Sequence, residues 1–125
     1  MGSQTGVTSV VVTYKPDLAI FARLIERLTP QVDAVVIVDN DDGKQLADWL
    51  EKNPNPNLIL LPLGTNRGIA AAQNVGIEWA RAHHSHYVLL LDHDSLPRPD
   101  MVDHLITTMK KKKALGEKVG MVGPR

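Results

Sequence analysis

The apolar residues of this chain change their spacing repeatedly, from continuous strand-like runs to the three- and four-residue spacing of amphipathic helices. Five strands and four helices can be placed in alternation. This alternation is typical of an α/β fold, and it predicts a mostly parallel, Rossmann-like sheet with flanking helices in the order βαβαβαβαβ. We expect a single domain over residues 1–125, because this length and 43 % hydrophobic residues suffice for one core.

The first predicted strand is a β-branched run too apolar for a strand with one exposed face, so we expect it near the centre of the sheet. The predicted strands are residues 7–14, 34–38, 58–61, 87–91 and 119–122. The predicted helices are a segment that opens at Asp17 and stops at Pro30, a short segment after Gly43, an alanine-rich segment capped by Thr65 or Asn66 that runs to about His83, and a segment from about Pro99 to Lys113.

Composition excludes several classes of function. Lys and Arg together number 14, as do Asp and Glu, so no overall field attracts the chain to a nucleic-acid polymer. The absence of cysteine excludes disulfides, thiolate metal sites and a cysteine nucleophile, and it fits a cytoplasmic protein. No apolar run is long enough to span a membrane, so we expect at most peripheral association, at the inner face of the membrane.

Polar clusters follow four of the predicted strands at their carboxyl ends. They are Thr13-Tyr14, Asp39-Asn40-Asp41, Asn66-Arg67-Gly68 and Asp92-His93-Asp94. Ligands of open α/β sheets bind beyond the carboxyl ends of the strands, where loops and helix N-termini converge. We therefore expect the functional site at this edge.

The pair Asp92 and Asp94 suggests a metal site. Residues two apart in an extended segment point to the same side, so both carboxylates can face one hard cation, Mg²⁺ or Mn²⁺. A cation held by one or two carboxylates keeps positions open for the oxygens of a diphosphate. The motif alone is weak, since Asp39 and Asp41 repeat it, and a solvated turn that caps the next helix is the alternative.

Taken together, these motifs resemble family 2 glycosyltransferases of the GT-A type, especially rhamnosyltransferase-like members. The resemblance covers essentially the whole chain. It rests on Val10-Val11-Val12-Thr13-Tyr14, Ile37-Val38-Asp39-Asn40, Asn66-Arg67-Gly68-Ile69-Ala70 with Asn74-Val75-Gly76, Leu90-Leu91-Asp92-His93-Asp94-Ser95, and the ending from Val119 to Arg125.

The resemblance implies roles for individual residues at the carboxyl ends of the strands. Thr13 and Tyr14 would line the nucleoside pocket, and Asp39 would contact the pyrimidine base. Arg67 would contact the base or position the nucleotide, and Asp92 would sit near the ribose.

The metal-dependent part of the site is implied in the same way. Asp94 would bind Mg²⁺ or Mn²⁺, with Asp92 beside it. The Asp-x-Asp-Ser variant is similar to that of enzymes that use dTDP-rhamnose, so rhamnose is favoured over the sugar of a UDP-sugar donor.

Family members are about twice as long as this chain, and their second half carries the acceptor site and the general base. The resemblance therefore implies inverting transfer from a nucleoside-diphosphate sugar to a saccharide or lipid-linked acceptor, with metal-assisted departure of the diphosphate. We expect the chain to be the donor-binding fragment of such an enzyme, inactive alone, with its catalytic residues unassigned.

Two other functions remain as alternatives. A nucleotidyltransferase uses a related sheet but needs a Gly-rich, basic phosphate loop after the first strand, where this chain has Lys15-Pro16-Asp17. A non-catalytic nucleotide- or metal-binding α/β module is the second. The G-x-G-x-x-G motif of dinucleotide-binding domains and the Gly-Lys-Ser/Thr loop of nucleoside triphosphatases are both absent from the sequence.

Several of these residues also have ordinary structural interpretations. Asp39, Asp41 and Asp42 fit an Asx-rich turn that ends at Gly43. The histidines at 83, 84 and 86 fit a helix end, where they complement the helix dipole, better than a metal site. Trp49 and Trp79 lie at core-facing helical spacing, which favours packing over stacking on a sugar.

Overall fold

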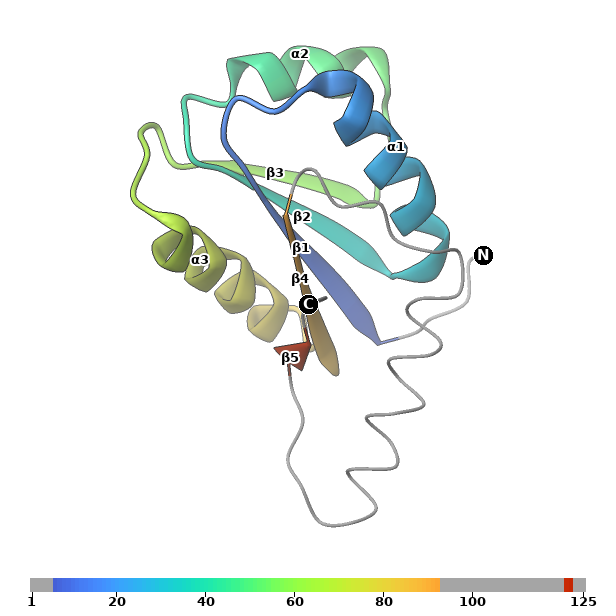
Figure 1. The fold of residues 1–125 in the computed structure, drawn as a ribbon. Helices are drawn as coiled ribbons and strands as arrows, with labels where there is room; N and C mark the ends of the chain where they lie inside the picture. Colours follow the sequence, from blue (N-terminus) through green and yellow to red (C-terminus); the bar gives the residue numbers. More distant parts are fainter. Residues whose placement is uncertain (1–5, 93–120, 123–125) are drawn as a thin grey trace.

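The protein is an open parallel sheet with helices on both faces (Figure 1), seen in a computed structural model that describes residues 6–92 and 121–122. The strands are β1 (Val7–Thr13), β2 (Ala34–Asp39), β3 (Leu58–Pro62), β4 (Tyr87–Asp92) and β5 (Met121–Val122). The helices are α1 (Leu18–Leu28), the 3-10 helix η1 (Thr29–Gln31), α2 (Lys44–Lys52) and α3 (Ile69–Ala82). The predicted α/β class is confirmed, whereas the helix predicted near Pro99 lies outside the described residues.

The strand order is β3-β2-β1-β4-β5, and every neighbouring pair is parallel. β1 lies at the centre, and all seven of its residues are buried. This confirms the position predicted from its unbroken apolar run, because a central strand of a parallel sheet is covered on both faces. Within the described part of the chain, no helix is long and apolar enough to cross a membrane.

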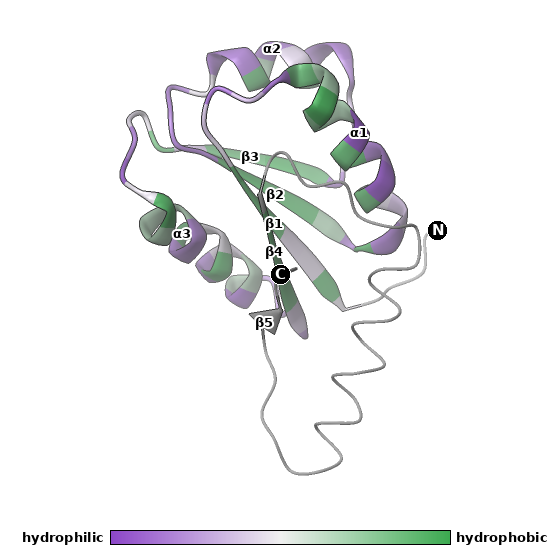
Figure 2. Ribbon diagram, in the orientation of Figure 1, coloured by the Kyte–Doolittle hydropathy of each residue, from purple (hydrophilic) through white to green (hydrophobic). Residues whose placement is uncertain are grey.

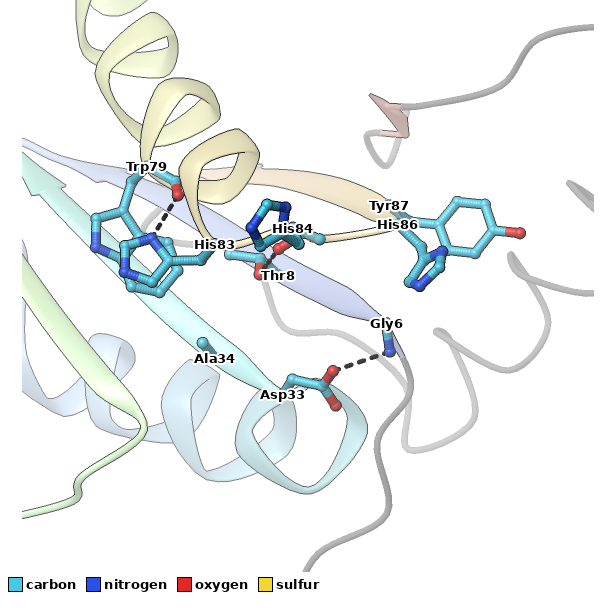
Figure 3. A pocket seen from close by; sticks show the side chains of 10 residues that line it. Gly6, Thr8, Asp33, Ala34, Trp79, His83, His84, His86 and Tyr87 are labelled. Carbon is cyan, nitrogen blue, oxygen red and sulfur yellow. Dashed lines mark hydrogen bonds between the residues drawn. The ribbon is translucent and has the colours of Figure 1, made fainter.

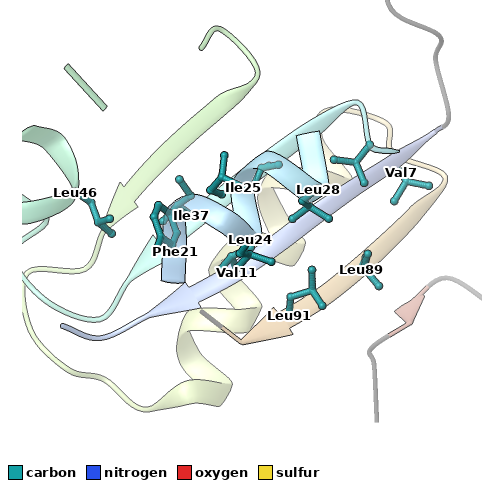
Figure 4. Packing of buried hydrophobic residues seen from close by; sticks show 12 residues of the cluster. Val7, Val11, Phe21, Leu24, Ile25, Leu28, Ile37, Leu46, Leu89 and Leu91 are labelled. Carbon is teal, nitrogen blue, oxygen red and sulfur yellow. The ribbon is translucent and has the colours of Figure 1, made fainter. Parts of the chain in front are cut away.

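One face of the sheet is covered by α1 and α2 (Figures 1 and 2). The apolar side of α1 packs on β1, β2 and β4, with Leu46 of α2 completing the cluster (Figure 4). Phe21 and Trp49 meet edge to face, with ring centroids 5.2 Å apart. Aromatic pairs favour this geometry, which agrees with the predicted packing role of Trp49.

Helix α1 begins where the sequence predicts it. The Oδ1 atom of Asp17 accepts hydrogen bonds from the amides of Ala19, at 2.9 Å, and Ile20, at 3.2 Å, and so caps the helix. The α-helix ends at Leu28, and Pro30 lies in the 3-10 turn that follows. Pro30 lacks the N–H that a further α-helical turn would need, so the chain tightens instead.

Helix α3 covers the opposite face and packs closely on the central strand. The residues it buries are Ala72, Gly76 and Ala80, three small residues at four-residue spacing. A Cβ atom added to Gly76 would lie 2.3 Å from Cγ1 of Val10 in β1. The short side chains therefore let the α3 backbone approach the central strand.

The predicted cap of α3 is wrong. Gly68 is the N-cap residue, with φ of 88°, and no side chain caps the helix. Oδ1 of Asn66 accepts a 2.9 Å hydrogen bond from the Gly68 amide, so Asn66 shapes the turn before the helix. Asn side chains commonly form such local turns, which compete with capping.

Candidate functional site

The carboxyl ends of β1, β2 and β4 meet at one edge of the sheet. The register places Thr13 beside Asp39 and Val12 beside Asp92. From β1, the chain adds β2 and then β3 on one side of the sheet, and afterwards β4 and β5 on the other side. The direction in which strands are added therefore reverses between β1 and β4. Open α/β sheets bind ligands at such a reversal, outside the carboxyl ends of the strands.

Thr13 and Asp39 form a buried pair at this edge. The Thr13 hydroxyl donates a 2.8 Å hydrogen bond to Oδ1 of Asp39, and the two residues are 0 % and 3 % exposed. Burial raises the pKa of Asp39, and the neighbouring carboxylates of Asp41 and Asp42 raise it further. The Thr13 hydroxyl and the Gly43 amide oppose this by bonding the carboxylate. The fold therefore holds a carboxylate fixed in place at a position where its charge is unfavourable.

Replacing Asp39 with asparagine is expected to remove a pH-dependent cost of folding. Because burial raises the pKa of Asp39 above the 3.8 of an unperturbed carboxyl, folding favours its protonated form. Protonated Asp39 therefore stabilises the folded protein fully at a pH below the pKa that Asp39 has in the unfolded chain. This stabilisation is lost as the pH rises through the pKa that Asp39 has in the folded protein. Urea unfolding between pH 3 and 7 should show the wild type losing stability relative to Asp39→Asn as the pH rises. A difference that is constant with pH, or of the opposite sign, would contradict this interpretation.

The polar residues of the turn after β2 make different hydrogen bonds. Oδ1 of Asp42 accepts a 2.9 Å hydrogen bond from the Lys44 amide, and Gly43 adopts a φ of 79°. Asp42 therefore has the Asx-turn role that the sequence allowed for the whole cluster. The carboxylate of Asp39 bonds the Gly43 amide of this turn and also the Thr13 hydroxyl at the end of β1, so it connects the turn to the sheet.

Asn40, the last residue of the motif Ile37-Val38-Asp39-Asn40, is central to this edge. Its side chain is 4 % exposed and bonds the loop that precedes α3. Oδ1 accepts a 3.2 Å hydrogen bond from the Arg67 amide, and Nδ2 donates at 3.3 Å to the Gly68 carbonyl. The sequence signal for this role was an amide residue that directly follows a buried strand.

Tyr14 and Arg67 lie at the same edge with exposed side chains. Tyr14 is 44 % exposed, and the ammonium of Lys15 lies 5.3 Å from the centre of its ring. Arg67 lies in the exposed loop 64–68, and among the described residues its guanidinium has no ion-pair partner. The structure thus brings Thr13 and Asp39 into contact, with Tyr14 and Arg67 exposed at the same edge.

The predicted metal ligands are only partly within the described residues. The backbone of Asp92 ends β4 next to Val12 of β1, at the edge that carries the Thr13–Asp39 pair, whereas Asp94 lies outside the described residues. Carboxylate oxygens are the donors that Mg²⁺ and Mn²⁺ prefer, so the residue types fit such an ion. In residues 6–91, no group of three or more histidine or acidic side chains could hold a metal.

A cavity of about 550 Å³ lies at the opposite edge, at the amino ends of the strands (Figure 3). Its lining residues include Thr8, Asp33, Trp79, His83 and Tyr87, and none of the predicted site residues. The rings of Trp79 and His83 stack with centroids 3.7 Å apart, and Nδ1 of His83 lies 2.8 Å from the Trp79 carbonyl oxygen. Trp79 also packs against the apolar cluster beneath α3, as predicted. The cavity is therefore separate from the edge where the predicted residues gather.

Comparison with known proteins identifies the family of the chain. The family model described as "Glycosyl transferase family 2" matches residues 9–121. The chain is 34 % identical over 110 residues to the dTDP-rhamnosyl transferase RfbF of Shigella flexneri. The aligned residues cover 88 % of this chain and 36 % of that protein. It is 33 % identical over 103 residues to the succinoglycan biosynthesis protein ExoO of Rhizobium meliloti (strain 1021), covering 80 % of this chain and 28 % of that protein.

The chain spans about a third of the length of these curated relatives. The family match covers all four strand ends described above, including both residues of the buried Thr13–Asp39 pair. By its sequence and its parallel α/β sheet, the chain is a member of glycosyl transferase family 2.

Proposed function

We propose that the chain is the donor-binding part of a metal-dependent, inverting glycosyltransferase, with a nucleoside-diphosphate sugar bound at the carboxyl edge of β1, β2 and β4. The buried Thr13–Asp39 pair is the observation that carries the proposal. An ionised carboxylate that is kept buried lowers the stability of the folded protein, and side chains whose pKa is shifted by burial concentrate at functional sites. The order of strands places the pair beside the reversal where such sheets bind ligands.

Asp39 suits the recognition of a uracil or thymine base. Both bases present an N–H donor between two carbonyl acceptors, and an ionised carboxylate is an acceptor only. Thr13 occupies one side of Oδ1 at 2.8 Å, which fixes the direction in which the remaining lone pairs point. Cytosine has an acceptor where uracil and thymine have the N–H, so the same carboxylate would disfavour it.

Exposed groups beside the pair suit the rest of the donor. Arg67 offers a planar cation for phosphate oxygens, and the exposed ring of Tyr14 offers a surface for the nucleoside. Helix α3 begins at Ile69, two residues after Arg67, with no acidic residue in its first turn and no side-chain cap on its amides. Helix N-termini of this kind attract phosphate groups.

The remaining parts of the site follow from the residue types. Asp94, with Asp92 beside it, would hold Mg²⁺ or Mn²⁺, which neutralises the departing diphosphate. We propose dTDP-rhamnose as the first donor to test, because one relative is named a dTDP-rhamnosyl transferase, and a UDP-sugar as the second. The acceptor would be a saccharide or a lipid-linked saccharide, met in the cytoplasm or at the inner face of the membrane. The general base would be supplied by a part of the enzyme beyond this chain, so the chain alone should not transfer sugar.

Amide NMR spectra recorded during titration with dTDP test where the nucleotide binds. We expect shifts of the amide signals of Thr13, Asn40 and Arg67 and none at Tyr87, which lies at the amino edge. Asp39→Asn replaces an ionised acceptor with an isosteric neutral group and should weaken dTDP binding about tenfold to hundredfold. Shifts confined to the amino-edge cavity, or none in the folded protein, would overturn the proposal.

A further inference from the structure

We propose that Asn40 is the positioning residue of the donor site. Its buried side-chain amide ties the loop 64–68 to the end of β2 and so sets Arg67 and the first turn of α3 beside the Thr13–Asp39 pair. This inference rests on the proposed function, because it concerns how the same site is held ready for a nucleotide. Asn40 acts through Arg67 and need not touch the ligand.

The loop is attached to β2 at two places. At its start, the amides of Leu63 and Gly64 donate 2.9 Å hydrogen bonds to the carbonyls of Asp39 and Asp41. At its end, the attachment comes from one side chain, because Asn40 accepts from the Arg67 amide at 3.2 Å and donates to the Gly68 carbonyl at 3.3 Å. A single buried amide therefore holds two consecutive residues of the loop.

Asn40 is itself fixed from the other side. Its backbone amide donates a 2.8 Å hydrogen bond to the Thr13 carbonyl at the end of β1. The same residue thus connects β1, β2 and the loop before α3. Any shift of Asn40 would move Arg67 relative to the Thr13–Asp39 pair.

The loop has little else to hold its shape. Gly64 and Gly68 adopt φ of 84° and 88°, and a Cβ atom built at either would have no neighbour within 4 Å. The bond from the Gly68 amide to Asn66 lies inside the loop and does not join it to the sheet. Such a segment keeps many conformations unless a contact from the fold selects one. Among the described residues, the Asn40 side chain joins Arg67 and Gly68 to the sheet, and the Gly68 carbonyl also accepts a 3.2 Å hydrogen bond from the Ala72 amide of α3.

An amide is the group that this position requires. It presents one acceptor and one donor side by side, matching the N–H of Arg67 and the carbonyl of Gly68. An aspartate would keep the acceptor but would face the Gly68 carbonyl with a second oxygen. It would also add a negative charge beside Asp39, which would repel a diphosphate bound at this edge.

A double-mutant cycle between Asn40 and Arg67 tests this role, with dTDP and Mn²⁺ titrated calorimetrically into each variant. Asn40→Ala and Arg67→Ala should each weaken binding, Arg67→Ala by about tenfold and Asn40→Ala by about three- to tenfold. If Asn40 acts through Arg67, the double variant should bind no more weakly than Arg67→Ala alone. Asn40→Asp should fail to restore the affinity.

Asn53→Ala is a matched control for a general loss of stability. The Asn53 side chain donates a 2.8 Å hydrogen bond to the Trp49 carbonyl at the end of α2, so its loss removes a bond away from the edge and should leave dTDP affinity unchanged. Hydrogen exchange of the Arg67 amide in the free protein should be faster in Asn40→Leu, which removes the acceptor of that amide but keeps a side chain of similar size. Asn40→Leu also serves as the second variant if Asn40→Ala fails to fold.

The two proposals fail in different ways. Wild-type affinity in Asn40→Ala, or penalties that add in the double variant, would overturn the positioning role and leave the proposed function standing. Unchanged exchange of the Arg67 amide in Asn40→Leu would also overturn it. A folded wild type that binds no dTDP would overturn the proposed function and the positioning role with it.

Discussion

Replacing Gly76 with alanine is expected to lower the free energy of unfolding by about 2 kcal/mol. The new Cβ atom would lie 2.3 Å from Cγ1 and 2.9 Å from Cγ2 of Val10, which is fully buried in the central strand. Valine has a stiff β-branched side chain, so α3 would have to move away from the sheet, at a cost of about 3 kcal/mol. The better helix propensity of alanine returns about 1 kcal/mol of this. Urea unfolding followed by circular dichroism measures the difference.

A compensating substitution separates steric overlap from other causes. Val10→Ala removes both methyl groups that the Gly76→Ala side chain would meet, at the cost of its own cavity. The double variant should therefore be more stable than the sum of the two single effects predicts, by about 1 kcal/mol or more. An increase in stability in Gly76→Ala, as helix propensity alone predicts, would contradict the close packing of α3 on β1. Simple addition of the stability changes of Gly76→Ala and Val10→Ala would contradict it as well.

The sequence predicted the strands well because buried parallel strands are continuous apolar runs. The predicted segments 7–14 and 87–91 differ by one residue from β1 and β4. Helix α1 was predicted from its cap at Asp17 and its apolar spacing, and both are present. The start of α3 was predicted less well, because Thr65, Asn66 and Gly68 are all acceptable before a helix, and only the tertiary fold decides among them.

The sequence predicted at which edge of the sheet the site lies, but it did not predict the contacts between the residues of the site. That edge follows from topology, since parallel strands end together. The contact between Thr13 and Asp39 depends on the register of β1 against β2, which pairs residues 26 positions apart. The bonds of Asn40 reach residues 27 and 28 positions away for the same reason. Pairings at such distances leave no periodic signal in one sequence.

The cavity at the amino edge could not be anticipated either. It is lined from β1, β2 and β4 and from the end of α3, segments whose amino-edge residues carry no shared motif. The histidines at 83, 84 and 86 are the local signal there, and they were interpreted as a helix end. His83 is the C-cap residue of α3 and stacks on Trp79, which agrees with that interpretation.

Removing the proposed metal ligand Asp94 is expected to have a large effect on nucleotide binding. Mn²⁺ should strengthen dTDP binding about tenfold or more, because a cation held by Asp94 and Asp92, as proposed, would neutralise the diphosphate at an edge that already carries Asp39, Asp41 and Asp42. In Asp94→Ala the gain from Mn²⁺ should disappear. The folding of this variant should be unchanged, which circular dichroism checks.

The most direct test is calorimetric titration of dTDP and UDP, each with and without Mn²⁺, into the wild type and Asp94→Ala. The account predicts binding by the wild type that Mn²⁺ strengthens, the loss of that strengthening in Asp94→Ala, and tighter binding of dTDP than of UDP. A folded wild type that binds neither nucleotide in the presence of Mn²⁺ would contradict the assignment of a donor site to this chain.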